Sequence, residues 1–499
     1  MTRSIIIKNN QTIPLREIPV LGYDEFLEYN TSLLREHYNH CVNYFGFPQR
    51  NEMQLICCIA NDSEHEIFVS SSVIDANTTQ YSFTKHHLSF HIFERELAEI
   101  SGINYCDHPW LKPVRFPADR KNKNSQIINY PFYNSHSEEL HEVGVGPIHA
   151  GVIEPGHFRF ICNGEQILHL EIQLGFQHRG IERLFQEKKK LLQRTTLAEN
   201  IAGDTVAGHS TAFANLWESL SGFKADDDLQ FSRTLALELE RIAVHTGNLS
   251  AICTDIGYQL GSAVFGRLRT PIINFFQNWC GNRLAKGLIR AGKNNFPFTY
   301  NLREQLTQLI NQFKPDFKEM YNEFKNLPSA MARLEKTGIV TQEQARSIGA
   351  VGMSAKMSGI SRDIRTSHPH DFYKNINHEP ILKKHGDVYS RTQIRKEEIL
   401  QSIKYIRGMM ENIPEENKNR NRLKSPSPES FCISLVEGWR GEICHCAVTD
   451  EQGELLYYKV KDPSMHNWLA LALAVRNNEI SDFPVCNKSF DLSYCGHDL

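Results

Sequence analysis

The alternation of apolar and polar residues predicts strands and one helix in the first part of the chain. Residues 54–60 and 66–74 are rich in strand-forming side chains. Residues 86–102 show helical spacing, and Gly102 is a typical helix terminator. The pattern predicts a compact α+β domain over residues 1–118.

A polar stretch with little periodicity, residues 119–143, follows this domain. Such stretches are typical of linkers, so we expect a second domain over residues 144–499. That domain opens with two strand-like runs around Asn163-Gly164, a dipeptide that favours a hairpin turn. Helical spacing follows in the ranges 181–199, 205–221, 229–253, 271–290, 301–325, 342–349 and 395–413. A second hairpin-like pair of strands is predicted over 433–450 and 454–460.

Composition places the chain among ordinary globular proteins. Apolar residues make up 40% and charged residues 23%, and the formal net charge is −3. No basic run is dense enough to follow a phosphate backbone, so nucleic-acid binding gains no support. The 12 cysteines include no C-x-x-C pair, and their spacing does not indicate a disulfide framework.

Apolar runs are too short for a signal peptide or a membrane span. The longest, Trp468 to Val475, has eight residues, against the roughly 20 that a spanning helix needs. We therefore expect a cytoplasmic chain whose membrane association is made through partners.

The end of the first domain carries a family resemblance. Residues 93–117 read FERELAEISGINYCDHPWLKPVRFP, with a Phe-Glu-Arg-Glu helix start and a His-Pro pair. This segment resembles the signature of the 30-kDa subunit of respiratory complex I. By residue type alone, Glu94, Arg95 and Glu96 are a solvated helix face.

The second domain resembles the 49-kDa subunit of complex I and, more closely, the large subunit of the related membrane-bound NiFe hydrogenases. The matching segments are GPIHAGVIEPGHFRF (146–160), GFQHRGIERLF (175–185), ALELERIAVHTGNLSAICTDIGY (236–258), ARSIGAVGMSAKMSGISRDIR (345–365), GDVYSR (386–391), VEGWRGEICHC (436–446) and DPSMHNW (462–468). Both domains in one chain resemble the fused large subunits of energy-converting hydrogenases. The resemblance implies an α+β fold, in which a small α/β sandwich-type domain precedes a mainly helical bundle with peripheral β-hairpins.

The chain departs from the hydrogenase pattern at the metal ligands. In residues 198–210, AENIAGDTVAGHS, the two family cysteines become Ala202 and Thr205. At the end of the chain, Leu492 and Cys495 stand at the second pair. Nickel and iron need bridging thiolates, which a methyl or hydroxyl group does not replace. The sequence therefore predicts no metal site and no hydrogenase activity.

The quinone-binding residues of complex I are also missing. Its histidine and tyrosine would fall near Pro155 and Gly203, and neither is present. The ending SFDLSYCGHDL (489–499) instead resembles energy-converting hydrogenase-related complexes, which keep the hydrogenase frame and the membrane partners without the metal ligands.

This resemblance implies a peripheral-arm subunit on the inner face of the cell membrane. A partner small subunit would hold a 4Fe–4S cluster, and membrane-embedded antiporter-like partners would translocate ions. The whole would be an NADH-quinone oxidoreductase-like complex that acts on NAD(P)H and on quinone or a similar acceptor, with no cofactor bound by this chain. The alternative is a catalytically silent scaffold that docks the iron–sulfur subunit onto the membrane arm.

Three residues are candidate proton carriers at the former metal cavity. The family glutamate of the hairpin loop, which takes protons from the metal site, corresponds to Glu154; the alternative is a partly exposed loop carboxylate. Asp204 lies between the former ligands and would exchange protons if buried; the alternative is an N-cap or surface aspartate on the first turn of the helix. His209 completes the set.

Other residues are assigned to the lining of that cavity: His157, His178, Arg179, Ala202, Thr205, Asp363, Arg365 and Cys495. For the pair His178-Arg179, a structural hairpin-to-helix junction is the alternative. For Asp363 and Arg365, it is a structural ion-pair network. Trp439 and Arg440 are assigned to a β-hairpin core.

Overall fold

A five-stranded sheet forms the centre of the N-terminal part. The computed structural model describes residues 2–49, 52–150, 153–418 and 420–499. The sheet has the order β1-β6-β5-β4, and β3 pairs with β6. Its strands are β1 (Ile5–Ile7), β3 (Val20–Leu21), β4 (Asn39–Gln49), β5 (Glu52–Asn61) and β6 (Glu66–Ile74).

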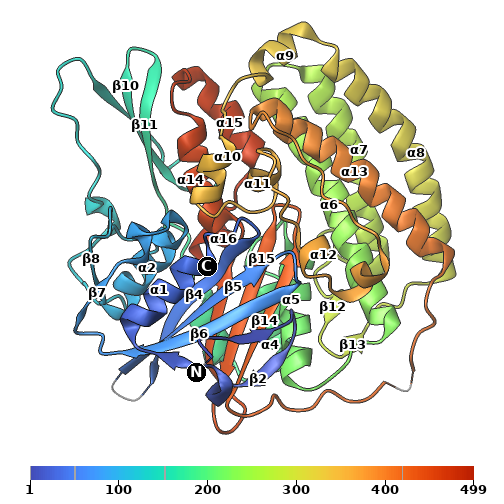
Figure 1. The fold of residues 1–499 in the computed structure, drawn as a ribbon. Coiled ribbons are helices and arrows are strands. Elements are labelled where there is room, and N and C mark those ends of the chain that lie inside the picture. Colours follow the sequence, from blue (N-terminus) through green and yellow to red (C-terminus); the bar gives the residue numbers. More distant parts are fainter. Residues whose placement is uncertain (1, 50–51, 151–152, 419) are drawn as a thin grey trace.

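Two helices cover one face of this sheet (Figure 1). They are α1 (Tyr23–Leu33) and α2 (His91–Ser101), and α2 ends at Gly102 with φ 81°, as expected for this terminator. A small parallel pair, β7 (Thr79–Tyr81) and β8 (Asn104–Cys106), flanks α2. Short 3₁₀ turns complete this part: Leu15–Glu17, Phe83–Lys85 and Leu88–Phe90.

A second sheet packs against the other face of the first. Its order is β16-β15-β14-β2, so that β2 (Thr12–Pro14) from the N-terminal segment pairs with β14 (Ser430–Glu437). The other strands are β15 (Glu442–Thr449) and β16 (Leu455–Lys461). The two sheets share one apolar core, in which Val42 and Ile56 lie with Ile433 and other residues of β14. The N-terminal segment is thus built into the C-terminal part.

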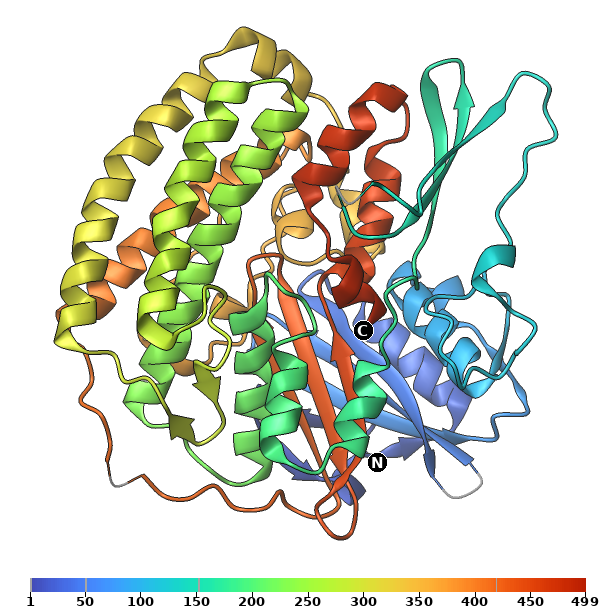
Figure 2. The ribbon, with the colours of Figure 1, turned by 180° about the vertical axis from the view of Figure 1, so that it is seen from behind.

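Long helices form the other half of the molecule, side by side in both ribbon views (Figures 1 and 2). They are α6 (Asp227–Asp255), α7 (Gln259–Cys280), α8 (Tyr300–Lys325) and α13 (Val388–Glu411). The helix α5 (Val206–Leu220) packs instead against β14 and β15. The shorter helices are α3 (Ile181–Glu187), α4 (Leu191–Ala198), α9 (Pro328–Leu334), α10 (Gln342–Ser347), α11 (Met353–Lys356), α12 (Ile364–Ser367), α14 (Ser464–Ala474), α15 (Phe483–Phe490) and α16 (Tyr494–Asp498). The mixed α+β class and the mainly helical second part are confirmed.

The hairpin expected around Asn163-Gly164 is present. It consists of β10 (His157–Asn163) and β11 (Gln166–Gln173), and β9 (His141–Val145) pairs with β10. It projects beside α14 and α15 (Figure 1). The remaining elements are β12 (Ile289–Arg290), β13 (Lys293–Asn294) and the 3₁₀ turns Ile127–Asn129, Asp371–Asn375 and Ile480–Asp482. Among the described residues, no helix combines the length and apolar character that a membrane crossing requires.

Three predicted helices differ clearly from the observed ones. The helix expected over 395–413 is α13, which begins seven residues earlier, at Val388. The helix expected over 271–290 is α7, which begins twelve residues earlier, holds Pro271 inside and ends before Gly281. Packing of α7 between α6 and α8 outweighs the helix-starting preference of proline. The helix expected over 181–199 is two helices, because Lys188 to Lys190 break it.

Candidate functional site

The former ligand positions lie where the start of α5 meets the start of α16. Ala202, Thr205 and Leu492 are buried, and Cys495 is half-buried. Arg440, in the turn between β14 and β15, joins the two segments. Its guanidinium donates to Asp204 Oδ1 at 2.6 Å and Oδ2 at 2.7 Å.

The Arg440 side chain uses its remaining donors on the same two segments. Nε donates to the carbonyl oxygen of Asp491 at 2.5 Å, and Nη1 donates to Thr205 Oγ1 at 3.1 Å. The guanidinium carbon lies 3.9 Å from the ring centroid of Trp439, whose Nε1 donates to Asp204 O at 2.8 Å. A buried cation that makes four hydrogen bonds therefore joins the segments that carry the former ligand positions.

Asp204 does not cap α5. Thr205 is the N-cap residue and makes no side-chain capping bond, whereas the Asp204 carboxylate pairs with Arg440. Burial alone would lower the pKa of Arg440, but the Asp204 carboxylate outweighs it and holds that pKa above its usual value. The helix-cap interpretation of Asp204 is wrong, because the hairpin turn places a guanidinium above it.

A second arginine bridges the same segments from the outside. Arg179 is exposed, and it donates to the carbonyl oxygens of Asn200 at 2.6 Å, Ile201 at 2.8 Å and Cys495 at 3.0 Å. His178 beside it donates from Nδ1 to Asp498 O at 2.7 Å. Both side chains hold the last helix of the chain against the loop before α5.

Glu154 lies beside the one remaining thiol. Burial and, after it, the nearby Glu154 carboxylate raise the pKa of Cys495 to about 11. The thiol also lies 3.4 Å from Ser493 Oγ. His157, by contrast, donates from Nδ1 to Gly146 O at 3.0 Å and packs on the hairpin side rather than with the former ligands.

A buried row of hydrogen-bonding side chains begins one turn into α5. His209 Nε2 lies 3.0 Å from Asp462 Oδ2, and His209 Nδ1 lies 3.0 Å from His445 Nε2. His445 Nδ1 lies 2.7 Å from the Tyr458 hydroxyl. Burial, followed by His209, lowers the pKa of His445 well below its usual value, so this ring is neutral. Burial by itself would raise the pKa of Asp462, but His209, Arg440 and Ser464 together outweigh burial and lower that pKa, which keeps the carboxylate ionised.

Glu240 closes the inner side of the site. Its carboxylate accepts hydrogen bonds from the backbone N–H groups of Ala207, at 2.7 Å, and Gly208, at 3.3 Å, in the first turn of α5. Burial raises the pKa of Glu240 to about 8, while the Ala207 N–H opposes the shift and the Asp204 charge adds to it. This carboxyl group is therefore largely protonated near neutral pH.

Asp363 and Arg365 lie in a buried ion-pair network under α6 and α13. Arg365 Nη2 lies 2.7 Å from Asp363 Oδ2, and Lys356 Nζ lies 3.2 Å from Asp363 and 2.6 Å from Glu398. Asp363 and Arg365 thus form the structural ion-pair network that is the alternative to lining the cavity. The network reaches the hairpin turn of Arg440 through Arg241, which donates to Gly438 O at 3.2 Å.

The complex I-like segment of the first domain is not solvated. Glu94 is buried and accepts from Ser82, Thr84 and the Phe83 N–H. Glu96 is also buried and pairs with Arg115 and Lys459, so it joins the two domains. The solvated-face interpretation of Glu94 and Glu96 is wrong, because α2 is packed on both sides.

The donor set does not fit a nickel–iron centre. Cys495 is the one thiol at the four ligand positions, and the Arg440 cation lies between them. Within the described part of the chain, no group of three or more histidine, cysteine, aspartate or glutamate side chains is arranged to hold a metal ion. A guanidinium that bridges the two segments repels a second cation.

Sequence reasoning misses most of the residues that define this site. It assigns Arg440 to a hairpin core, and it does not point to Glu240, His445, Tyr458 or Asp462. The signal for Arg440 is its place in the turn Gly438-Trp439-Arg440-Gly441, where a charged side chain between glycines has no strand role. Asp462 lies in DPSMHNW, one of the segments that carry the family resemblance.

The chain is similar to complex I-like and hydrogenase-related large subunits. Residues 255–433 match the family described as "Respiratory-chain NADH dehydrogenase, 49 Kd subunit". Over 444 residues the chain is 27% identical to hydrogenase-4 component G of Escherichia coli (strain K12), covering 85% of this chain and 77% of that protein.

Two other relatives extend the comparison. The C/D component of NADH-quinone oxidoreductase from Phocaeicola vulgatus is 27% identical, covering 80% of this chain and 82% of that protein. The membrane-bound hydrogenase subunit alpha of Pyrococcus furiosus is 24% identical, covering 70% and 85%. These matches confirm the resemblance to complex I-like, hydrogenase-related fused subunits, and all three relatives are named as parts of larger assemblies.

Proposed function

We propose that this chain is a peripheral-arm subunit of a membrane-associated, complex I-like oxidoreductase. In this proposal, electrons from NAD(P)H reach a 4Fe–4S cluster in a partner small subunit and pass to quinone or a similar acceptor at the site between α5 and α16. Membrane-embedded, antiporter-like partners then translocate ions. The names of the relatives support the coarser part, an oxidoreductase-complex subunit.

The observation that carries the proposal is the buried row Asp462, His209, His445 and Tyr458. With His209 neutral, each bond points one way: Tyr458 donates to His445, His445 to His209, and His209 to Asp462. When one proton is added to His209, its Nδ1 donates to His445, and His445 then donates to Tyr458. Both of these bonds thus reverse their direction. A row that accepts a proton by reorientation suits reduction of an acceptor that takes up protons with its electrons.

Glu154 would supply such protons from the surface. It is partly exposed, and it lies beside Cys495 at the edge of the site. Asp204 is held by Arg440 and would act by releasing that cation. No hydrogenase activity is expected, since the thiolates for nickel and iron are missing.

The closure of the site by Arg440 supports a second candidate function, the catalytically silent scaffold. An acceptor that binds between Asp204, Thr205 and Asp491 would first have to displace this cation. In the scaffold form, the chain docks the cluster subunit onto the membrane arm and takes no part in the chemistry.

The deciding experiment uses the assembled complex purified with its partners. Reduction of a soluble quinone is followed in wild type, in Glu154→Gln and in His209→Gln, and Glu165→Gln in the exposed hairpin turn serves as the control. Turnover that falls at least about tenfold in the first two variants, with subunit content unchanged, supports the oxidoreductase. Turnover that is absent in wild type, or equal in all four proteins, rejects it in favour of the scaffold.

A further inference from the structure

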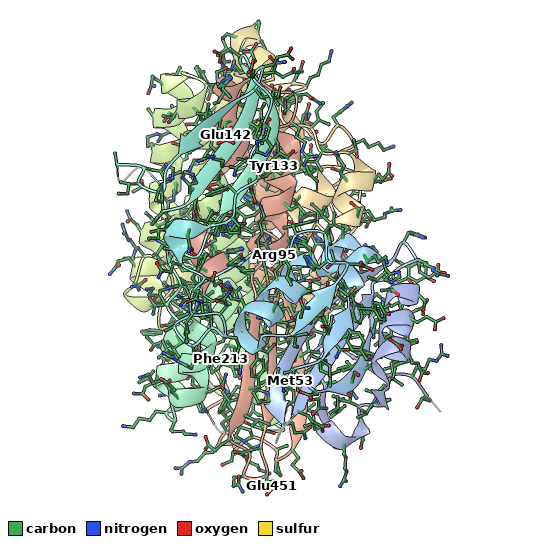
Figure 3. All side chains as sticks on the ribbon, turned by 90° about the vertical axis from the view of Figure 1, so that its left-hand side faces the viewer. Met53, Arg95, Tyr133, Glu142, Phe213 and Glu451 are labelled. Carbon is green, nitrogen blue, oxygen red and sulfur yellow. The ribbon has the colours of Figure 1, made fainter. Side chains whose placement is uncertain are left out.

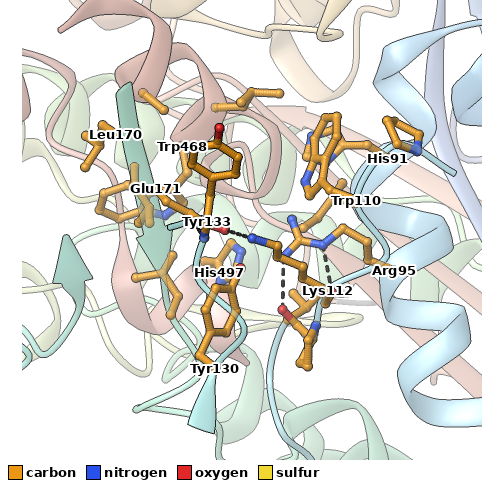
Figure 4. Close-up of a pocket in the computed structure, with 18 of the residues that line it drawn as sticks. His91, Arg95, Trp110, Lys112, Tyr130, Tyr133, Leu170, Glu171, Trp468 and His497 are labelled. Atoms are coloured by element: carbon orange, nitrogen blue, oxygen red, sulfur yellow. Dashed lines mark hydrogen bonds and ion pairs between the residues drawn. The ribbon is translucent and has the colours of Figure 1, made fainter. Parts of the chain in front are cut away.

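Two of the cavities between the domains differ in what their polar groups do. The larger, of about 630 Å³, is mainly apolar, and Arg95 in its wall lies on the face that Figure 3 shows. Arg95 donates to backbone carbonyl oxygens, and Lys112 pairs with Glu171 (Figure 4). The unpartnered ring nitrogens of His91 and Trp468 are sealed from this space. Its accessible polar groups are thus already satisfied.

The smaller cavity, of about 60 Å³, lies between the segment before β4 and the part of the second domain around α10. Such a volume holds about four water molecules, and a phosphate group is of comparable size. Three arginines line the cavity, Arg35, Arg346 and Arg362, and Glu36 is the one carboxylate among the lining residues. Its size and charge therefore suit one small anion.

Arg362 presents an unused donor to this cavity. The residue is only 3% exposed. Its Nη1 donates to Ala350 O at 2.9 Å, and its Nε lies 3.5 Å from Asp62 Oδ2. Nη2 makes no hydrogen bond to a described residue, and, unlike Nε, it is not sealed from the cavity. An anion that accepts from Nη2 would form a charge-assisted hydrogen bond, which is stronger than one between neutral groups.

His87 offers a second donor from the first domain. Its Nδ1 accepts from the Ser89 N–H at 3.4 Å and lies 2.8 Å from Ser89 Oγ, so Nε2 carries the ring hydrogen. Nε2 has no hydrogen-bond partner among the described residues and is not sealed either. Burial, followed by the charge of Arg362, lowers the pKa of His87 to about 4, so a neutral ring lies near the guanidinium.

The carboxylates behind the inner wall do not cancel this positive charge. His40 Nδ1 lies 3.2 Å from Asp62, and its Nε2 lies 2.6 Å from Glu442, which also pairs with Lys461 at 2.6 Å. Burial and Arg362 would lower the pKa of His40, but Asp62 and Glu442 outweigh them and raise it, which favours the cationic ring. Three cations, His40, Lys461 and Arg362, thus lie against two carboxylates.

We propose that this interdomain cavity binds a phosphate group, which accepts hydrogen bonds from Arg362 Nη2 and His87 Nε2. The exposed Arg35 and Arg346 at its edge make no ion pair with a described residue and add to the attraction. The group is inorganic phosphate or the phosphate of an organic monoester, and the shared chemistry is a tetrahedral oxyanion. The two donors come from different domains, so the bound anion joins them. This site is separate from that of the proposed function and does not rest on it.

Isothermal titration calorimetry on the purified full chain tests the proposal. Inorganic phosphate and phenyl phosphate are titrated in a chloride buffer of constant ionic strength, so that general charge screening is the same throughout. At least one of them should bind with a Kd of about 1 mM or tighter, and the tighter of the two identifies a free or an ester-linked phosphate. Absence of binding by both at about 10 mM would overturn the proposal.

Variants tie the binding to this cavity. Arg362→Gln should weaken the tighter probe at least about tenfold, and His87→Phe, which keeps a ring and removes the Nε2 donor, about fivefold. A surface pair leaves the buried groups untouched: Arg346→Gln should weaken binding about threefold, whereas Arg422→Gln, at an exposed arginine outside the lining, should leave it unchanged. Circular dichroism shows whether each variant is folded.

Three results count against the site. Equal binding by wild type and folded Arg362→Gln would show that the guanidinium does not hold the anion. Equal losses in Arg346→Gln and Arg422→Gln would show a general effect of net charge. Binding to the isolated chain but not to the assembled complex would show that a partner polypeptide fills the space, which also overturns the proposal.

Discussion

The region around Arg440 and the region around His91 and Trp468 treat their buried polar groups in opposite ways. Around Arg440, the guanidinium is bonded to the segments before α5 and α16, and the N–H of Trp439 is satisfied by Asp204 O. The N–H of Trp468 and the ring of His91, by contrast, have no partner among the described residues. One region satisfies its buried donors within the protein, whereas the other leaves them without a partner.

The difference bears on where a ligand would bind. The family resemblance points to the positions around Arg440, but the polar groups there are already satisfied and a ligand must first displace an ion pair. The unsatisfied groups of His91 and Trp468 lie elsewhere, in a part of the molecule to which the resemblance draws no attention. The following predictions test this contrast, from the largest expected effect to the smallest.

The largest effect concerns Glu240 and pH. Its pKa is about 8 in the folded chain, above the ordinary value of 4.5, so the folded state holds a proton that the unfolded state releases. The stabilisation is full below about pH 4.5 and is lost as pH rises through about 8. Chemical denaturation of wild type should therefore lose about 4 kcal/mol relative to Glu240→Gln between about pH 5 and about pH 8. A constant difference between the two proteins over this range would contradict the raised pKa.

Arg440→Ala should have the next largest effect on stability. It removes a buried cation that bridges Asp204 and Asp491, and it leaves an empty space; since Asp204 is partly exposed, we expect a loss of about 3 kcal/mol in the free energy of unfolding. Urea denaturation measures it. The variant should also bind small aromatic probes between α5 and α16, and a loss below about 1 kcal/mol would mean that Arg440 does not close the site.

A pair of tryptophan variants compares the two regions directly. Trp439→Phe breaks a hydrogen bond to Asp204 O, whereas Trp468→Phe removes an N–H that has no partner in the described structure. Thermal denaturation should show Trp439→Phe to be less stable than Trp468→Phe by about 1 kcal/mol. Equal stabilities would remove the contrast between satisfied and unsatisfied donors.

Arg179→Lys should have the smallest effect. A lysine keeps the charge but loses the planar fork that reaches Asn200, Ile201 and Cys495 together. Because Arg179 is exposed, the expected loss of stability is about 0.5 kcal/mol. Hydrogen exchange at the backbone of α16 should rise, and unchanged protection there would assign Arg179 no part in holding the helix.

Much of the fold follows from local patterns. The hairpin at Asn163-Gly164, the end of α2 at Gly102 and the boundaries of α8 are set by turn residues and apolar spacing, which the sequence displays directly. The start of α7 is not set by such local signals. Pro271 looks like a helix start, but the residues before it are held helical by their packing against α6.

The site is predictable only in outline. The resemblance finds Ala202, Thr205 and Cys495, and the structure brings their segments together as expected. The contact between Asp204 and Arg440 spans 236 residues, and no periodicity or spacing reports such a pair. Whether the assigned residues carry protons or line a substrate site stays a prediction.

The pairing of β2 with β14 has a consequence for how this chain comes apart. A protease cut in the segment 119–143 would break the covalent link between the two domains but leave Thr12–Pro14 in the sheet of the other part, over a shared core. The fragments would be expected to migrate together until denatured, as a nicked but whole particle. The linker then serves as a tether that raises the local concentration of two halves already matched to each other.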